Sequence, residues 1–363
     1  MNIPKLSINS MMRPFRLSLE SVSRPSAKNR TGENMGEIRK TFLKHEPPIV
    51  IGDFIGSGGF SNVFRAKSNY NGMRDFAIKI LRSGLIKPRK GGGFDAALEE
   101  MRIKDIKKRF TNESYVQWDL SQHLSDLVSQ SVVKVYDHGE FDTKRRYRFI
   151  LMEQMQSTLR DFIKNKANFV NDPSTLKYKT LLMTKIADII SNVHQEGIFH
   201  RDIKPENIFF SREDPTAFPA AAAPVGRRSY EQEIQVKLGD FGTVRWVRTY
   251  NDTFDGIIIG SQWYLSPEQI YNPEHLDIRT DIYSFGIVCY ELLYGAHPKN
   301  INANTRNLLA KLANAKPAAR TPPKGFETLH EIIFKCMQDV GKRYQSMGDV
   351  VGELRRFLRK IRP

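Results

Sequence analysis

The sequence predicts an α+β fold, because strand-like and helix-like patterns occupy different parts of the chain. Short runs rich in β-branched and aromatic residues come first, at residues 49–67, 75–81 and 132–136. Apolar residues at helical spacing follow, at residues 181–194, 278–294, 308–312, 329–337 and 350–358. The chain has 363 residues, of which 40% are hydrophobic, so it can form a sizeable core in one or two domains.

The first two strands surround a glycine-rich turn, Gly56–Gly59. Glycines allow a backbone to approach a phosphate group closely, because a Cβ would clash or forbid the required dihedral angles. The next strand, Asp75–Leu81, alternates as a buried strand does and contains Lys79. Burying an ammonium group among apolar residues is costly without an anionic partner. We therefore expect phosphate oxygens or a carboxylate beside Lys79.

Three further segments complete the organisation of the chain. Residues 94–128 show a long helical pattern. Residues 278–294 are apolar on nearly all faces, which is typical of a buried central helix. Residues 211–232 are rich in Pro and Ala and predict a flexible insertion between two short strands.

The chain is strongly basic, with a formal net charge of +16. Such a charge favours acidic partners such as nucleic acid, anionic lipid or an acidic protein surface; the alternative is a basic tail plus a cleft that holds a polyphosphate. Residues 1–46 form a basic extension with little periodicity, which we expect to be mostly disordered. This extension is either a solvated tail, a docking, regulatory or nucleic-acid-binding arm, or an organelle-targeting peptide.

The cysteines and the distribution of apolar residues indicate the cellular compartment in which the protein is expected to lie. Cys289 and Cys336 are the two cysteines and form no spacing pattern, which fits a reduced, cytoplasmic environment. Cys289 lies in an apolar helical run, so we expect a small buried residue there. No run approaches the roughly 18 apolar residues that a membrane span needs. The N-terminus also lacks the apolar core of a secretory signal.

A polar segment, His200–Asn207, precedes the apolar strand Ile208–Phe210. Asp240-Phe241-Gly242 and Ser266-Pro267-Glu268 follow it in the chain. Together with the glycine-rich turn and the strand containing Lys79, these motifs resemble in order and spacing the catalytic domain of eukaryotic-type serine/threonine protein kinases. The resemblance implies a bilobal fold, with a β-rich N-lobe and its C-helix at residues 47–152 and a mainly helical C-lobe at residues 153–363. ATP would bind in the cleft between the lobes.

The resemblance also implies catalytic and metal-binding roles. Asp202 would accept the proton of the substrate hydroxyl, and Lys204 would stabilise charge on the moving phosphoryl group. Lys79 would hold the α and β phosphates of ATP. Asn207 and Asp240 would bind Mg²⁺.

Further residues are implied to surround the nucleotide. Met152 would lie beside the adenine, backbone groups of Glu153 and Met155 would hydrogen-bond its edge, and Phe60 would cap the loop over the phosphates. The complete expected nucleotide-binding set is Ile55, Gly56, Ser57, Gly58, Gly59, Phe60, Ser61, Val63, Ala77, Lys79, Glu113, Met152, Glu153, Met155 and Asn207.

Two features depart from the family pattern. Ser61 stands where a third glycine usually lies, and residues 82–109 are longer and more basic than is usual before the C-helix. The glutamate that pairs with Lys79 is therefore ambiguous. Glu113 follows Arg109-Phe110 as the family's glutamate does and is preferred, with Glu99 or Glu100 as alternatives.

Other residues are implied to be structural or regulatory. The His200 ring would pack against Phe241, Asp281 would accept backbone N–H groups of the catalytic loop, and Arg343 would pair with Glu268. Arg201 lies directly before Asp202, a position where an arginine is typical of kinases that are activated by phosphorylation. The phosphorylated segment of such kinases corresponds to the segment after Gly242. Its candidate sites are Thr249 and Thr253, and less favourably Tyr250.

The implied reaction is transfer of the γ-phosphoryl group of MgATP to Ser or Thr hydroxyls of protein substrates, including autophosphorylation. Lys204, two residues after Asp202, and Gly260-Ser261 resemble Ser/Thr-specific members. A scaffolding pseudokinase would lack at least one of four residues, all of which are present: Lys79, Asp202, Asn207 and Asp240. A kinase-like enzyme acting on a small molecule or lipid would usually lack the Ser-Pro-Glu loop and its partner Arg343.

Overall fold

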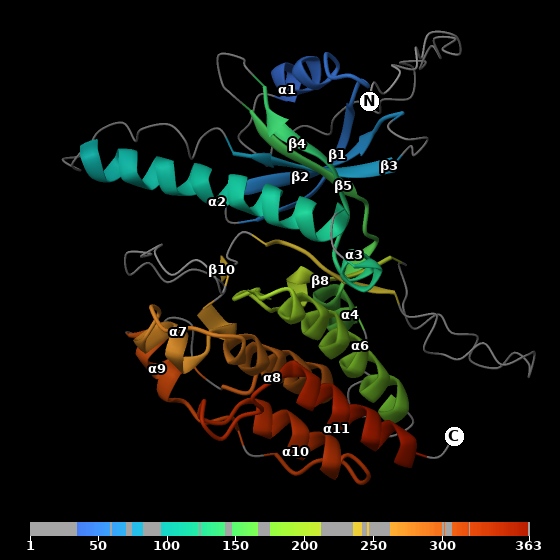
Figure 1. Cartoon of the computed structure of the whole chain (residues 1–363), viewed down its shortest axis with the longest axis vertical. Coiled ribbons are helices and arrows are strands. Elements are labelled where there is room, and N and C mark those ends of the chain that lie inside the picture. Colours follow the sequence, from blue (N-terminus) through green and yellow to red (C-terminus); the bar gives the residue numbers. More distant parts are fainter. Residues whose placement is uncertain are drawn as a thin grey trace, which may run out of the picture.

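The computed structural model describes most of the chain and divides it into two lobes (Figure 1). The described residues are 35–58, 60–69, 75–82, 96–122, 125–141, 147–165, 175–211, 235–241, 245–246, 262–299, 301, 307–318 and 320–361.

The N-lobe is built on a five-stranded antiparallel sheet with the order β1-β2-β3-β5-β4. Its strands are β1 (Val50–Ser57), β2 (Ser61–Lys67), β3 (Asp75–Leu81), β4 (Val135–Glu140) and β5 (Arg148–Glu153). The central strand β3 is buried at every position except Asp75, as its apolar composition predicts. This strand carries Lys79 into the interior of the molecule.

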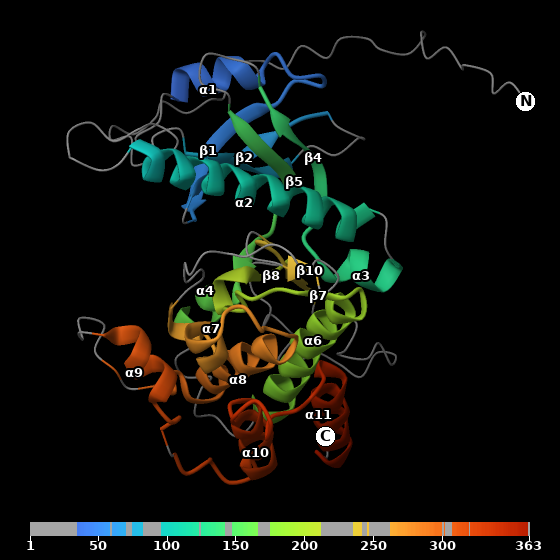
Figure 2. The same ribbon diagram turned by 60° about the vertical axis from the view of Figure 1, so that its left-hand side comes forward.

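Helix α1 (Met35–Phe42) corrects the expected boundary of the basic extension. Ile38 and Phe42 are fully buried in the N-lobe core, and the Phe42 ring lies 4.6 Å from that of Phe141 and 5.2 Å from that of Phe149. Apolar burial thus outweighs the basic composition here, and residues 35–46 belong to the folded N-lobe. The expected disorder of residues 1–34 concerns a segment outside the described residues. Figures 1 and 2 show α1 at the end of the sheet farthest from the C-lobe.

Helix α2 (Ala96–Gln122), followed by α3 (Asp126–Ser131), accounts for the helical pattern expected at 94–128. α2 lies between the sheet and the C-lobe in both views (Figure 2). Its buried residues Ile106 and Phe110 pack against Leu81, Val135 and Ile150 of the sheet. This packing fixes α2 beside β3, and therefore beside Lys79.

The C-lobe is mainly helical, as expected. Its helices are α4 (Leu159–Asn165), α6 (Leu176–Gln195), α7 (Pro267–Tyr271), α8 (Arg279–Tyr294), α9 (Leu308–Asn314), α10 (Glu327–Cys336) and α11 (Met347–Lys360). Its short strands are β6 (Ser157–Thr158), β7 (Ile198–Phe199), β8 (Ile208–Phe210), β9 (Val236–Leu238) and β10 (Arg245–Trp246). Strands β6, β8 and β9 form one sheet, and β7 pairs with β10.

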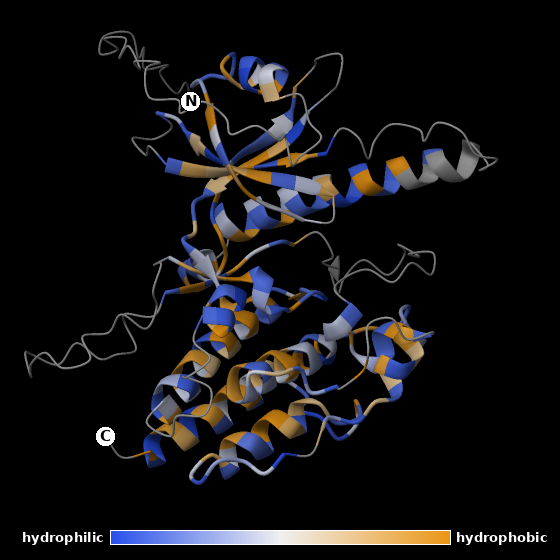
Figure 3. Cartoon of the chain, turned by 180° about the vertical axis from the view of Figure 1, so that it is seen from behind, coloured by the Kyte–Doolittle hydropathy of each residue, from blue (hydrophilic) through white to orange (hydrophobic). Residues whose placement is uncertain are grey.

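Helix α8 is the buried centre of the C-lobe that its pattern, apolar on nearly all faces, predicts: every residue of the helix after Arg279 is buried. Cys289, within this helix, is a buried free thiol as expected. In Figure 3 apolar residues gather along the helices of this lobe. Gly286 allows α10 to approach α8: a Cβ on Gly286 would lie 2.7 Å from Met337 Cγ and 2.8 Å from Cys336 Cβ.

Among the described residues, no helix is both long enough and apolar enough to span a bilayer. Apart from Ser211, the expected flexible insertion at residues 211–232 lies outside the described part of the chain.

Candidate active site

The loop after β7 has an unusual backbone that a buried carboxylate holds in place. Arg201 has a φ of 67°, in the left-handed region that costs a non-glycine residue about 1–2 kcal/mol. Asp281, at the start of α8, accepts the N–H groups of His200 and Arg201, each at 2.7 Å. Gln269 of α7 donates to the Arg201 carbonyl at 2.9 Å. These bonds offset the backbone cost and fix the residue that precedes Asp202.

Asp281 remains ionised in this role. Its side chain is fully buried and also accepts a hydrogen bond from His194 Nε2 at 2.9 Å. Although burial alone would raise it, the hydrogen bonds from His194 and from the backbone hold the pKa of Asp281 below its ordinary value. The expected backbone role of Asp281 agrees with these contacts.

Asp202 is held by two polar neighbours from its own loop. Lys204 Nζ donates to Asp202 Oδ2 at 2.6 Å, and Asn207 Nδ2 donates to the same oxygen at 3.2 Å and to the Asp202 carbonyl at 2.9 Å. Burial opposes the charged form of Lys204, but the Asp202 carboxylate outweighs burial and raises the pKa of Lys204. A charged lysine therefore fixes the orientation of the Asp202 carboxylate.

The His200 ring is structural, as expected. It lies 4.7 Å from the Phe241 ring, its Nε2 contacts the Gly239 carbonyl at 3.1 Å, and its Nδ1 accepts the Asp202 N–H at 3.3 Å. Burial lowers the pKa of His200, so the ring is neutral at pH 7. The neutral tautomer with its proton on Nε2 satisfies both contacts.

Lys79 pairs with one carboxylate of its own lobe and with one of the C-lobe. Its Nζ contacts Glu113 of α2 and donates to Asp240 Oδ1 at 3.1 Å. Burial works against the ammonium, yet Asp240 and Glu113 together raise the pKa of Lys79. Burial and the nearby Asp240 charge raise the pKa of Glu113 to about 7, whereas Lys79 outweighs burial and lowers the pKa of Asp240.

The ambiguity over the glutamate partner of Lys79 is thereby resolved in favour of Glu113. Glu113 is 4% exposed and lies in the buried part of α2, whereas Glu100 is exposed near its beginning. The side chain of Glu99 lies outside the described residues. Asp240 has a φ of 65°, so it is a second non-glycine residue held in the left-handed region at this site.

The register of the sheet brings the expected adenine-side residues together. Ala77 of β3 pairs with Met152 of β5, and the chain leaves β5 at Glu153. The Glu153 N–H donates to the Lys134 carbonyl at 2.9 Å, so this N–H already has a partner. Of the Glu153 backbone groups, we therefore expect only the carbonyl to hydrogen-bond the adenine. The Met155 N–H makes no hydrogen bond to any described residue.

The glycine-rich turn is only partly as expected. A Cβ on Gly56 would meet nothing within 4 Å, so packing within the protein does not explain this glycine. Phe60 is half-buried and packs against the apolar cluster that α2 forms with the sheet, which includes Leu81, Ile106 and Phe110; its expected place over the phosphates stays a prediction. Ser61 is buried at the start of β2, and its carbonyl accepts the Gly58 N–H at 2.9 Å.

The other expected residues of this region fall into two groups. Ile55 is 47% exposed and Ser57 is also exposed, both on β1, while Val63 is half-buried on β2. Several expected residues lie outside the described part of the chain: Gly59, Gly242, Thr249, Tyr250, Thr253 and Ser261.

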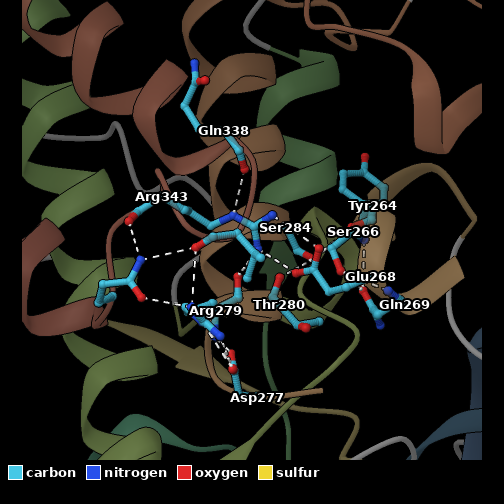
Figure 4. A network of polar contacts seen from close by, with 12 residues as sticks. Tyr264, Ser266, Glu268, Gln269, Asp277, Arg279, Thr280, Ser284, Gln338 and Arg343 are labelled. Carbon is cyan, nitrogen blue, oxygen red and sulfur yellow. Dashed lines mark hydrogen bonds and ion pairs between the residues drawn. The ribbon is translucent and has the colours of Figure 1, made fainter. Parts of the chain in front are cut away.

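The Ser-Pro-Glu motif begins α7, and hydrogen bonds and an ion pair hold it in place (Figure 4). The Ser266 side chain accepts the Gln269 N–H, and Gln269 Oε1 accepts the Ser266 N–H, which forms a capping box. Arg343 donates to Glu268 Oε1 at 2.6 Å, as expected. Figure 4 shows Ser266 beside Gln269, and Arg343 and Glu268 in the same network of polar contacts.

One residue of the region carried no sequence signal. Arg160, at the beginning of α4, donates to Glu206 Oε1 at 2.7 Å, to Glu291 Oε2 at 3.1 Å and to the Tyr264 hydroxyl. Its partners lie 46 to 131 positions away along the chain, so no local pattern could reveal the cluster.

A β-rich lobe with one long helix, joined to a helical lobe by a lysine that pairs with one carboxylate of each lobe, is the two-lobed architecture of protein kinases. Residues 49–351 match the family described as protein kinase domain, and the chain belongs to this family.

Curated relatives agree with the family assignment. A probable serine/threonine-protein kinase of Clostridium perfringens is 28% identical over 311 residues, which cover 84% of this chain and 37% of the relative. Serine/threonine-protein kinase PrkC of Bacillus subtilis is 30% identical over 304 residues, 83% of this chain and 39% of the relative. PknB of Mycobacterium tuberculosis is 30% identical over 252 residues, 68% of this chain and 32% of the relative. The chain thus spans about two fifths of the length of the first two relatives and about one third of the third.

Proposed function

We propose that this chain is an ATP-dependent serine/threonine protein kinase, which transfers the γ-phosphoryl group of ATP to Ser and Thr hydroxyls of proteins, its own included. The observation that carries the proposal is the pairing of two loop carboxylates with lysines: Asp202 with Lys204, and Asp240 with Lys79. Phosphoryl transfer needs positioned phosphates, neutralised charge and an oriented nucleophile, and these groups can supply all three.

Asp202 is the residue to orient the nucleophile. A substrate hydroxyl beside it would donate its proton to the carboxylate as the hydroxyl oxygen bonds to the γ-phosphorus and the bond to ADP breaks. Lys204 and Asn207 hold one carboxylate oxygen, so the orientation of Asp202 is set before the substrate arrives. Lys204 also keeps a positive charge where negative charge develops on the transferred group.

Lys79 is the residue to hold the phosphates of ATP. Glu113 and Asp240 keep it charged inside the protein, and the uncrowded Gly56 leaves room for phosphate oxygens beside the backbone. On the adenine side, the Met155 N–H and the Glu153 carbonyl are the backbone groups proposed to meet the base, with Met152 and Ala77 beside it.

Asn207 and Asp240 are proposed to bind Mg²⁺, and their chemistry fits this ion. The Asn207 amide nitrogen already donates to Asp202, so its oxygen is the atom suited to a cation. The Asp240 side chain is 37% exposed although Lys79 contacts one of its oxygens. Hard divalent cations prefer such amide and carboxylate oxygens. When bound, Mg²⁺ would neutralise charge on the phosphate oxygens.

Two rival functions are less well supported. A pseudokinase would be expected to lose a charged contact of the site, whereas Lys79, Asp202 and Asp240 are all paired. An enzyme for small molecules or lipids would not need the Ser-Pro-Glu motif, which Arg343 anchors here.

Transfer from ATP labelled in its γ-phosphate, with Mg²⁺ and a generic basic protein, tests the proposal. Acid hydrolysis of the product should yield labelled phosphoserine or phosphothreonine. Label on tyrosine or on a lipid alone, or no label although ATP binds, would refute it.

An acidic partner or nucleic acid for the basic extension stays a prediction from charge alone. Removal of residues 1–34 should then abolish a steeply salt-dependent binding of nucleic acid by the full chain.

A further inference from the structure

Arg148, at the start of β5, reaches from the N-lobe sheet to helix α2. Its Nη1 donates to the Lys107 carbonyl at 3.1 Å and to Thr111 Oγ1 at 3.0 Å, two groups about one turn apart on α2. Its Nε donates to Glu140 Oε2 at 2.6 Å. Glu140 of β4 is the register partner of Arg148, so the sheet itself orients the guanidinium.

Apolar packing alone does not fix α2 at this flank. A hollow of about 190 Å³ lies between α2 and the strands β4 and β5, and Arg148 and Thr111 are among the residues that line it. Ile106 and Phe110 pack against the sheet, but apolar attraction is non-directional and leaves the rotation of the helix about its axis weakly determined. A planar guanidinium binds several acceptors in a fixed geometry. The hydrogen bonds of Arg148 therefore supply the restraint that packing lacks here.

The rotation of α2 about its axis decides whether Glu113 reaches Lys79. Glu113 follows Thr111 by two residues, which places it about 200° farther around a helix of 3.6 residues per turn. Arg148 thus holds α2 on the flank roughly opposite to Glu113. A rotation that turns Glu113 away from Lys79 must also displace the Lys107 carbonyl and the Thr111 hydroxyl from the guanidinium.

We propose that Arg148 is a positioning residue for the Lys79–Glu113 pair, because its guanidinium fixes the rotation of α2. This role rests on the proposed kinase function, in which Lys79 holds the phosphates of ATP. Arg148 acts through Glu113 and not on the substrate itself. Once Glu113 turns away, Lys79 keeps Asp240 as its carboxylate partner and is drawn from the place that the pair of carboxylates defines.

Steady-state transfer from ATP to a generic basic protein tests this role. Arg148→Met should lower kcat about tenfold, the size expected of one charge-assisted hydrogen bond, and leave the KM of the protein substrate unchanged. Lys67→Met is the matched control. Lys67 forms a similar cross-strand ion pair with its register partner Asp75, at 4.0 Å, but its side chain is 74% exposed and it should keep the wild-type kcat when replaced.

A double-mutant cycle with Glu113→Gln separates positioning from a general loss of stability. If Arg148 acts through Glu113, Arg148→Met should have no further effect on kcat in the Glu113→Gln protein. A full additional tenfold loss in that protein would overturn the proposal.

If Arg148→Met does not fold, two variants of Thr111 provide the test. Valine keeps the shape of threonine and removes the hydroxyl oxygen that accepts from Arg148, whereas serine keeps that oxygen. Thr111→Val should lower kcat about threefold, because the Lys107 contact remains, and Thr111→Ser should stay close to the wild type. Equal rates in the two Thr111 variants would overturn the proposal.

Trp118 gives a second measurement that needs no phosphoryl transfer. It lies on α2 seven residues after Thr111 and so on the same flank, and its ring is 5.5 Å from that of His138 in β4. Arg148→Met should shift the fluorescence emission to longer wavelength, because a turned α2 exposes the Trp118 ring that now packs against the sheet. Trp118→Phe should remove this shift.

The two measurements distinguish failure of the proposal from failure of the kinase function. A wild type that binds ATP but transfers no phosphate would refute the kinase function, while the emission shift in Arg148→Met would still support the restraint on α2. Unchanged emission in Arg148→Met would overturn the proposal whether or not the protein transfers phosphate.

Discussion

Arg343 and Glu268 form a buried ion pair that joins the start of α7 to the loop before α11. The Arg343 side chain is fully buried and that of Glu268 is 17% exposed. Arg343 also donates to the carbonyls of Arg279 and Gln338, at 2.7 and 3.1 Å (Figure 4). The pair therefore holds three segments together beneath the Ser-Pro-Glu motif.

Glu268→Gln should lower the free energy of unfolding by about 3–5 kcal/mol, because it leaves the Arg343 charge buried and unpaired. Urea denaturation measures this change. Glu353→Gln makes the same chemical change in an exposed pair with Arg356 and should cost less than about 1 kcal/mol. Equal effects of the two substitutions would contradict the assignment of a structural role to the Arg343 pair.

Gly286→Ala should destabilise the C-lobe by about 1–3 kcal/mol, because the added Cβ collides with α10. Gly352 of α11 has open space around it and provides the control. Gly352→Ala should raise stability by about 0.5–1 kcal/mol through helix propensity. Thermal unfolding distinguishes the two, and a more stable Gly286→Ala protein would show that α8 and α10 do not pack closely at Gly286.

His200 should make the protein less stable in mild acid. Its pKa is lowered by burial, so the unfolded chain takes up a proton below the ordinary value of 6.5 before the folded protein does. The neutral His200 ring therefore stabilises the fold fully above pH 6.5. This contribution to the free energy of unfolding is lost as the pH falls through the pKa of His200 in the folded protein, by at most about 1.4 kcal/mol per pH unit.

His200→Phe keeps an aromatic ring against Phe241 and removes the titration. The fall in the free energy of unfolding between pH 7.5 and 5.5 should then be smaller than in the wild type. Other histidines whose pKa is lowered by partial burial, such as His138 and His297, titrate in both proteins and cancel in the comparison. An unchanged fall would mean that the His200 ring is charged in the fold.

Phe42→Ala should destabilise the N-lobe by about 3–5 kcal/mol, because it empties a fully buried site. The neighbouring Leu43 is 45% exposed, so Leu43→Ala should change stability by less than about 0.5 kcal/mol. Limited proteolysis and denaturation can compare the two variants. Similar small effects would show that α1 is not part of the N-lobe core.

Much of the architecture follows from local sequence. The alternation around Lys79 and the nearly all-apolar faces of α8 predict their burial, and the resemblance to protein kinases predicts the partnership of Arg343 with Glu268. The choice of Glu113 over Glu100 depended on where α2 packs, so sequence could only rank the candidates.

Other features arise from contacts between distant segments. Phe60 packs on α2, and Phe42 of α1 packs against aromatic residues of the N-lobe. Arg160 hydrogen-bonds residues from three separate elements. In each case the local sequence predicted a different position or none, because burial against a distant part of the chain decides where the residue packs.

The most direct test of the proposed kinase function is the rate of phosphoryl transfer in Asp202→Asn, with Asp188→Asn as the control. Asp188 is an acid of α6 that pairs with Arg355 outside the site. Asp202→Asn should reduce the rate by at least about a hundredfold while ATP still binds, and Asp188→Asn should leave it unchanged. Equal rates in wild type and Asp202→Asn would contradict the role of Asp202 and with it the proposed mechanism.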